Sequence, residues 1–268
     1  MPFKKIAPEK LSSMVISQIE QLILRGILRP GERLPAEREL AERLAVSRPS
    51  LREAIAELQE KGLLVSKAGS GIFVADVLGS AFSPSLIALF RAHEETVFDY
   101  ISFRRDLEGL AASRAAKQAS KTDLMVIQSV LDKMITAYQK QSTRIEAQLD
   151  AKFHMSIIEA SNNVIMLHMM RSMFDLLTED VFYNRQQMFK QKVSRAQLLE
   201  QHRAINAALQ IRDPIGAQRA VEAHLDYVET MLRDALISRR NESISKQRYA
   251  HAQRDTVTKP TASKTSSN

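Results

Sequence analysis

One aspartate and three histidines in the C-terminal half of the chain could together bind a metal ion. Asp150 and His154 lie four residues apart, so on a helix their side chains face the same way. His202 and His224 lie at equal distances before and after residue 213, which with residue 214 forms an Asp-Pro pair typical of a helix start. On antiparallel helices joined there, their imidazoles would lie at about the same height. One carboxylate and three imidazoles suit a divalent transition metal, with one position left for water or another ligand. Since single histidines more often have a packing role, a purely structural role for all four is the alternative.

A second group of residues, hydroxyls and arginines, gathers between residues 34 and 64. This segment predicts two short amphipathic helices joined by a tight turn at residues 45–46, with Ser47 as the N-cap of the second helix. Hydroxyls and a helix N-terminus suit phosphate oxygens, and arginine forks suit guanine edges. An ordinary charged helical hairpin is the alternative. The DNA contacts would come from Ser47, Arg48, Ser50 and Arg52.

The flanking elements place these groups in two domains. An apolar helical stripe precedes the hairpin, and two β-prone runs separated by residues 68–70 follow it, as in a winged helix-turn-helix. The rest reads as six or seven helices with no strand pattern, an all-α bundle. The predicted fold class is therefore mainly α. The predicted boundaries are 1–76 for the winged helix-turn-helix, 77–85 for a linker, 86–238 for the bundle and 239–268 for a basic disordered tail.

Composition narrows the classes of function. The net charge is +7, and most of it lies in residues 239–268, which hold 7 Lys and Arg against 2 Asp and Glu. The regions expected to fold therefore carry little excess positive charge, too little for an architectural nucleic-acid binder. The chain has no cysteine, which excludes a cysteine-based metal site and agrees with a reducing compartment. No apolar signal region and no long apolar run is present. We therefore expect a cytoplasmic protein with no membrane partner.

The sequence RPGERLPAERELAERLAVSRPSLREAIAELQEKGLL, followed by a glycine-containing wing, resembles the DNA-binding domain of the GntR family of bacterial transcription regulators. Pro49 stands where the family often has a hydroxyl residue, and Ala68 where one relative has a base-reading histidine, so these two contacts are not expected here. The resemblance implies DNA contacts at Arg38, Ser47, Arg48, Ser50, Arg52 and Gly69.

The C-terminal half resembles the FCD effector domain of the FadR subfamily. The resemblance rests on the D-x3-H pattern, a histidine before an Ile-Asn-Ala-Ala run and a further histidine downstream. It implies dimerisation through this domain and a bound divalent metal, zinc first and nickel or manganese as alternatives. Arg104 matches the arginine of the family's R-x-x-L-E motif and would hold an effector carboxylate bidentately. The alternative is a structural pair with Glu108. The implied metal ligands are Asp150, His154, His202 and His224.

Together these features predict a metabolite-responsive regulator and not an enzyme. We expect a repressor that binds a palindromic operator in double-stranded DNA as a homodimer and is released by a small organic acid held at the metal. The likeness is nearest to regulators of pyruvate, lactate or glycolate metabolism, which points to 2-oxo or 2-hydroxy acids. Two alternatives are a sensor for which the metal itself is the signal and a metal-dependent hydrolytic enzyme.

Overall fold

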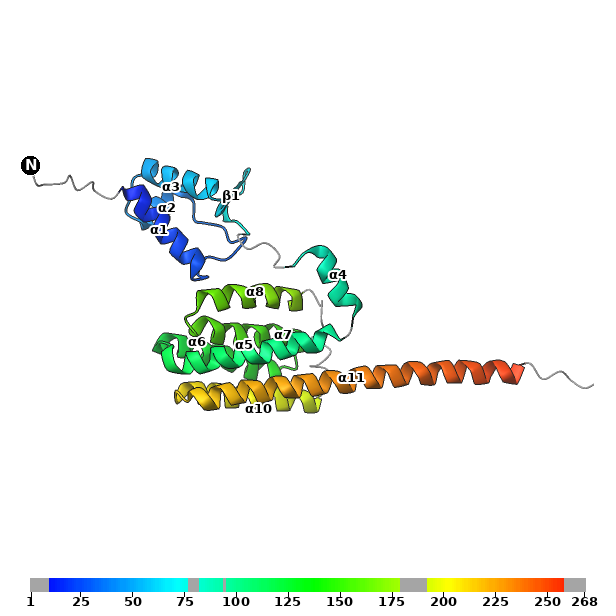
Figure 1. The fold of residues 1–268 in the computed structure, drawn as a ribbon. Coiled ribbons are helices and arrows are strands. Elements are labelled where there is room, and N and C mark those ends of the chain that lie inside the picture. Colours follow the sequence, from blue (N-terminus) through cyan, green and yellow to red (C-terminus); the bar gives the residue numbers. More distant parts are fainter. Residues whose placement is uncertain (1–9, 77–81, 94, 179–191, 258–268) are drawn as a thin grey trace, which may run out of the picture.

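The computed structural model describes residues 10–76, 82–93, 95–178 and 192–257. The chain forms a small N-terminal body and a larger helical body that lies below it in Figure 1. The N-terminal body has the winged helix-turn-helix order predicted from the sequence. Its elements are α1 (Leu11–Leu24), α2 (Glu37–Arg43), α3 (Arg48–Glu60), β1 (Leu64–Lys67) and β2 (Gly71–Val74). Apolar side chains of these elements form one core, which includes Val15, Ile19, Ile23, Leu51, Ile55, Leu58, Leu64 and Val74.

Local features of the sequence determine where α3 begins. The side chain of Ser47 accepts the backbone N–H of Ser50 at 3.2 Å, which confirms the predicted N-cap. Pro49 lies in the first turn, where its missing N–H leaves no helical hydrogen bond unmade. β1 and β2 then pair antiparallel, with Lys67 opposite Gly71, so that residues 68–70 form the hairpin tip as predicted.

The helical body consists of helices that run mainly side by side. They are α4 (Pro84–Ala92), α5 (Thr96–Gln118), α6 (Lys121–Gln139), α7 (Thr143–Ala160), α8 (Val164–Thr178), α10 (Lys192–Gln210) and α11 (Pro214–Val257). α5 packs along α11, α6 along α7, and α10 along α11. A capping box at Ser120 and Asp123 starts α6, and the Asp213 carboxylate accepts the Gly216 N–H at the start of α11. Short turns therefore join α6 to α7 and α10 to α11, and these helices share one hydrophobic core with α5.

The structure differs from the predicted boundaries at two places. The predicted linker, residues 77–85, overlaps α4, which begins at Pro84, while residues 77–81 lie outside the described residues. The tail from residue 239, which was predicted to be disordered, instead continues α11 as far as Val257. Between Gly216 and Pro260 the chain has no glycine or proline, so nothing in the sequence stops the helix earlier. Residues 258–268 lie outside the described part. None of the helices described is long and apolar enough to cross a membrane.

Polar contacts join the N-terminal body to α7 and α8. His168 on α8 lies 2.8 Å from the carbonyl oxygen of Leu24, and Arg171 donates to the carbonyl oxygen of Gly26 at 3.0 Å. Arg171 also pairs with Glu159 of α7 at 3.0 Å. Gly26 has a φ of +69°, and a Cβ there would overlap the Arg171 guanidinium. The end of α1 is therefore held directly against the helical body.

Candidate functional site

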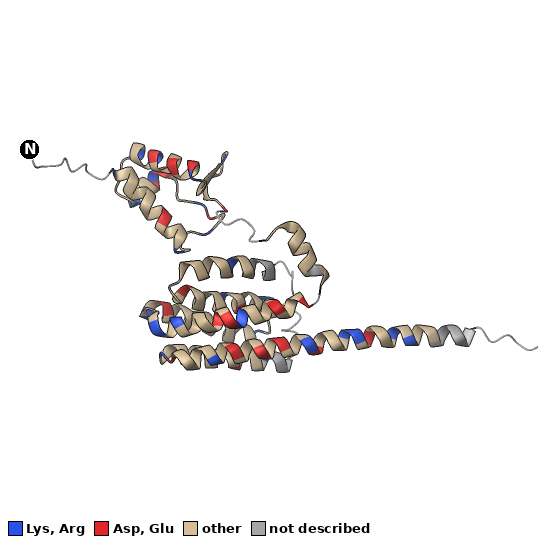
Figure 2. Ribbon diagram, viewed as in Figure 1, with Lys and Arg blue, Asp and Glu red and all other residues tan. Residues whose placement is uncertain are grey.

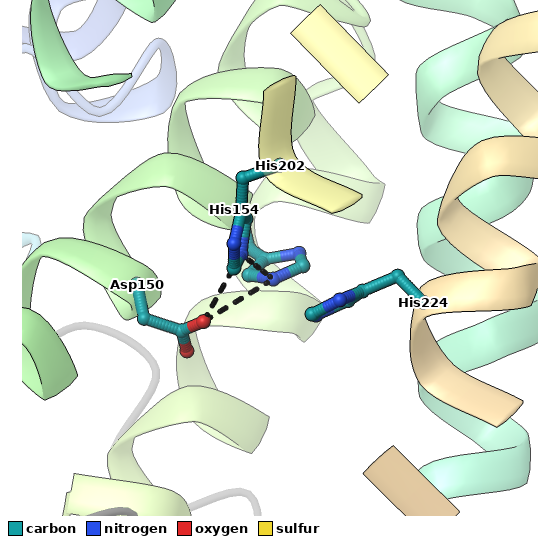
Figure 3. Close-up of side chains that lie close together, drawn as sticks. All are labelled: Asp150, His154, His202 and His224. Carbon is teal, nitrogen blue, oxygen red and sulfur yellow. Dashed lines mark hydrogen bonds and ion pairs between the residues drawn. The ribbon is translucent and has the colours of Figure 1, made fainter. Parts of the chain in front are cut away.

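The four residues predicted as metal ligands meet inside the helical body (Figure 3). α7 contributes Asp150 and His154, α10 contributes His202, and α11 contributes His224. Each offers a ligand atom, and these atoms all lie within 4.8 Å of one another. The His202 and His224 ring centroids lie 4.6 Å apart, as the sequence symmetry about the turn at residue 213 predicts. All four residues are buried, so the cluster excludes bulk water.

The donor atoms are aimed at a common point. Asp150 Oδ1 lies 3.1 Å from His202 Nε2 and 3.8 Å from His154 Nε2, and the two Nε2 atoms lie 3.4 Å apart. An imidazole nitrogen can bind a metal only through its lone pair. A carboxylate oxygen facing two such nitrogens is a donor set that suits a divalent cation.

The other ring nitrogen of each histidine contacts an oxygen acceptor. His202 Nδ1 donates to the carbonyl oxygen of Leu198 at 2.6 Å, and His224 Nδ1 donates to Oε1 of Gln201 at 2.9 Å. His154 Nδ1 lies 2.6 Å from Oε2 of Glu108. The first two oxygens accept the Nδ1 proton, and the Glu108 carboxylate favours a proton on Nδ1 by its charge, without hydrogen-bond geometry. Nε2 is then left as the nitrogen that can bind a metal. The rings are thus fixed in the tautomer that a metal site needs.

Burial also keeps the imidazoles in the form that binds metal. It lowers the pKa of His224 well below the usual histidine value of 6.5, and the neighbouring His202 and His154 lower the pKa further. Burial likewise lowers the pKa of His154, although Glu108 opposes the shift. A metal ligand must be a neutral imidazole, so these groups are ready to bind near neutral pH.

Arg104 does not lie in the ligand cluster but is linked to it through Glu108. Its Nε donates to Oε1 of Glu108 at 2.6 Å, and the second oxygen of the same carboxylate faces His154. The guanidinium carbon lies 4.9 Å from the centre of the Phe174 ring. Burial alone would raise the pKa of Glu108, but Arg104 and His154 outweigh it and lower the pKa to about 2. The structural pair considered for Arg104 is therefore present, and it leads directly to a predicted metal ligand.

The residues present fit a divalent transition metal. Three imidazoles and one carboxylate supply four donors, and the site has no thiolate that would favour softer ions because the chain has no cysteine. Asp150, His154, His202 and His224 would hold the ion. Bound there, it would supply a Lewis acid that binds carboxylate or hydroxyl oxygens.

The expected DNA-binding residues gather at the N-terminal end of α3. Arg48 is its first residue and Arg52 lies one turn later, and both side chains are exposed. The remaining charges of the helix, Glu53, Glu57 and Glu60, are acidic, exposed and nearer its C-terminal end (Figure 2). Since phosphates repel carboxylates, this gradient favours entry of the N-terminal end of α3 into the major groove.

Two expected contacts are engaged with carboxylates in this structure. Arg52 Nε donates to Oε2 of Glu37 at 2.7 Å, and Arg38 lies 3.8 Å from Glu42. Both arginines are exposed, so a phosphate or base can replace these surface partners at small cost. Gly69 is at the exposed hairpin tip with a φ of +68°, where a glycine is favoured.

Sequence reasoning missed the contact between Glu108 and His154 and the role of His168. The two residues of the first pair come from α5 and α7, and no spacing rule connects those helices. His168 contacts the Leu24 carbonyl in the other body. A contact between domains leaves no periodic signal in the sequence.

Comparison with known proteins identifies the family. An Escherichia coli (strain K12) protein named as an L-lactate dehydrogenase operon regulatory protein is 34% identical over 232 residues, which cover 85% of this chain and 88% of the relative. The family model for bacterial regulatory proteins of the gntR family matches residues 11–74, and the FCD domain model matches residues 99–227. The chain belongs to the GntR family.

Other relatives of this regulator agree. The Glc operon transcriptional activator of Escherichia coli (strain K12) is 35% identical over 228 residues and covers 84% of this chain and 89% of the relative. The HTH-type transcriptional regulator LutR of Bacillus subtilis (strain 168) is 32% identical over 212 residues, covering 79% of this chain and 96% of the relative. The protein is therefore a bacterial transcription regulator with an N-terminal DNA-binding domain and a C-terminal FCD domain, and its relatives are regulators rather than enzymes.

Proposed function

We propose that this regulator binds a palindromic operator as a homodimer and is released by a small 2-oxo or 2-hydroxy acid. The acid would be held at a divalent metal ion, zinc in the first place, bound by Asp150, His154, His202 and His224. The observation that carries the proposal is the buried cluster of four donors within 4.8 Å of one another. A relative named for the L-lactate dehydrogenase operon supports the class of acid, because L-lactate is a 2-hydroxy acid.

The roles of the residues around the metal follow from their chemistry. Arg104 is a buried guanidinium that is linked to the cluster through Glu108. We assign it the effector carboxylate, because a guanidinium binds a carboxylate with two parallel hydrogen bonds. Buried surroundings strengthen such a pair relative to water. The amide of the effector acid, which carries no charge, should therefore be a much poorer effector than the acid itself.

Helix α7 provides a path from this site to the DNA-binding body. It carries Asp150 and His154 near its middle and Glu159 near its end. Glu159 pairs with Arg171, which also contacts the Gly26 carbonyl oxygen in the N-terminal body. An effector changes operator affinity only if it binds two arrangements of the protein differently. Movement of α7 would supply that difference by changing the orientation of the two DNA-binding domains in the dimer.

On the DNA side, we assign direct contacts to Arg38, Ser47, Arg48, Ser50, Arg52 and Gly69. Arg48 and Arg52 would read bases, and the Ser47 and Ser50 hydroxyls would contact phosphates, because these groups surround the N-terminus of α3. Half-sites one helical turn apart would match the two-fold symmetry of a dimer.

The test is operator binding by the full-length protein with zinc present, across a panel of small carboxylic acids. We expect one or a few 2-oxo or 2-hydroxy acids to release the DNA, and His202→Ala to abolish the response. His93→Ala is the matched control, since His93 is exposed and pairs with Glu95 outside the cluster. Operator binding that no acid of the panel changes would refute the effector assignment.

The same experiment separates the two alternatives. If zinc alone switched operator binding, with no acid needed, the metal itself would be the signal. If a bound acid were converted to product, the site would be an enzyme. Release by an acid that is recovered unchanged supports the proposed regulator.

A further inference from the structure

Glu108 makes two short contacts, one on each carboxylate oxygen. Oε1 lies 2.6 Å from Nε of Arg104, and Oε2 lies 2.6 Å from Nδ1 of His154. Glu108 is only 2% exposed, and its two partners are each 1% exposed. A buried carboxylate is costly unless its charge is balanced, and Arg104 supplies that balance from the next turn of α5. Arg104 thus holds one oxygen of the Glu108 carboxylate, and the other oxygen lies against His154.

The contact with His154 determines which nitrogen of that ring can bind a metal. The two atoms are 2.6 Å apart but do not meet hydrogen-bond geometry, so the effect of Glu108 on the ring is electrostatic: a carboxylate oxygen repels a nitrogen lone pair and favours the tautomer that carries its proton on Nδ1. Nε2 is then the lone-pair nitrogen, and it is the atom that faces His202 and Asp150. The Nδ1 atoms of His202 and His224 face uncharged acceptors, a carbonyl and an amide oxygen. Among the Nδ1 atoms of the three histidines, that of His154 is the one that faces a carboxylate, and a charged partner there makes an imidazole a stronger donor to a metal.

We propose that Glu108 is a positioning residue of the metal site, which fixes the tautomer and ring plane of His154, and that Arg104 in turn holds Glu108 in place. This inference rests on the metal binding proposed above. It gives the Arg104–Glu108 pair a role in metal affinity rather than in folding alone. The competing interpretation is a buried ion pair that only stabilises the helical body.

The chain contains a matched control for that interpretation. Glu146 is also a buried carboxylate, 3% exposed, and it is paired with an arginine, Arg195, at 2.7 Å. In the contacts of the described residues, its oxygens meet Arg195 and none of the ring nitrogens of His154, His202 and His224. Glu146→Gln therefore removes the same charge from the same helical body without removing an acceptor from a histidine.

The test is a zinc titration of the full-length protein against a chromophoric chelator, after removal of bound metal. Glu108→Gln keeps the size of the side chain but removes its charge. We expect it to weaken zinc binding about 10- to 100-fold, the usual effect of losing a partner behind a metal ligand. Glu146→Gln should bind zinc as the wild type does. Equal zinc affinity in the wild type and Glu108→Gln would overturn the proposal, and so would equal losses in the two variants.

A second measurement reads the ring directly. Long-range ¹H–¹⁵N NMR spectra of the metal-free protein distinguish the two imidazole tautomers. The wild type should show His154 protonated on Nδ1, and Glu108→Gln should show a mixture, because an amide can also donate to that nitrogen. If Glu108→Gln does not fold, Glu108→Asp keeps the charge but shortens the side chain, and its zinc affinity should fall below that of the wild type; an unchanged affinity counts against the proposal. If the wild type itself binds no zinc, the proposed metal function fails, a result distinct from failure of the role of Glu108.

Discussion

Zinc should stabilise the folded protein strongly, and the size of the effect can be worked out. The donor atoms already lie within 4.8 Å of one another, so little rearrangement is needed on binding. Binding to the folded state alone then adds about 2.7 kcal/mol when zinc is present at about 100 times its Kd. In a body of this size, about 1 kcal/mol moves the unfolding temperature by roughly 2–4 °C. We therefore expect an increase of roughly 5–11 °C.

The assay is differential scanning calorimetry of metal-free protein, with zinc added in increasing excess over the site. Asp150→Asn should remove most of the increase, because it replaces the one carboxylate of the cluster with a neutral amide. His93→Ala, which changes a histidine outside the cluster, should keep all of it. An increase of equal size in Asp150→Asn and the wild type would mean that zinc binds elsewhere, and the reasoning about the cluster would be refuted.

Three further predictions concern DNA contact, the joint between the bodies, and pH. Arg48→Ala should weaken operator binding by about 1–3 kcal/mol while changing binding to unrelated DNA much less, as measured by fluorescence anisotropy at fixed salt; equal losses on both DNAs would assign Arg48 to phosphate. Gly26→Ala should destabilise the protein by about 1–2 kcal/mol in urea unfolding, because it places a Cβ at positive φ against Arg171; unchanged stability would contradict the contact. Because burial lowers the pKa of His154 and His224 in the folded state, the unfolded chain gains protons first as the pH falls below 6.5. Metal-free protein should therefore lose stability as the pH falls from about 7.5 to about 5.5 and change little above that range; a flat profile would contradict the burial of the two rings.

The N-terminal domain could be predicted from the sequence because its signals are local. Ser47, Pro49 and the apolar spacing of α3 each specify a feature within a few residues, and the structure has them where the sequence places them. The gathering of Asp150, His154, His202 and His224 could also be predicted, although these residues are far apart in the chain. Asp150 and His154 share one helix face, and the turn at residue 213 brings His202 level with His224.

The parts that could not be predicted depend on contacts between elements without a fixed spacing. Glu108 reaches His154 only because α5 and α7 pack side by side. Arg171 reaches the Gly26 carbonyl only through the relative placement of the two bodies. The extension of α11 was missed for another reason. Its polar composition suggested disorder, but residues with adequate helix propensity that continue an already formed helix need no hydrophobic face of their own.

The length of α11 makes motion at the buried cluster easy to observe. Its 44 residues span about 66 Å, and about 50 Å of that lies beyond His224. A tilt of about 5° at His224 would move the far end by about 4 Å, with the helix treated as straight and its rise taken from standard geometry. The exposed end is also a ready attachment point, because the chain has no cysteine and one introduced at Ser245 would be unique. In the proposed homodimer, a probe there would report a small rotation at the buried cluster as a displacement large enough for distance measurements between the two copies.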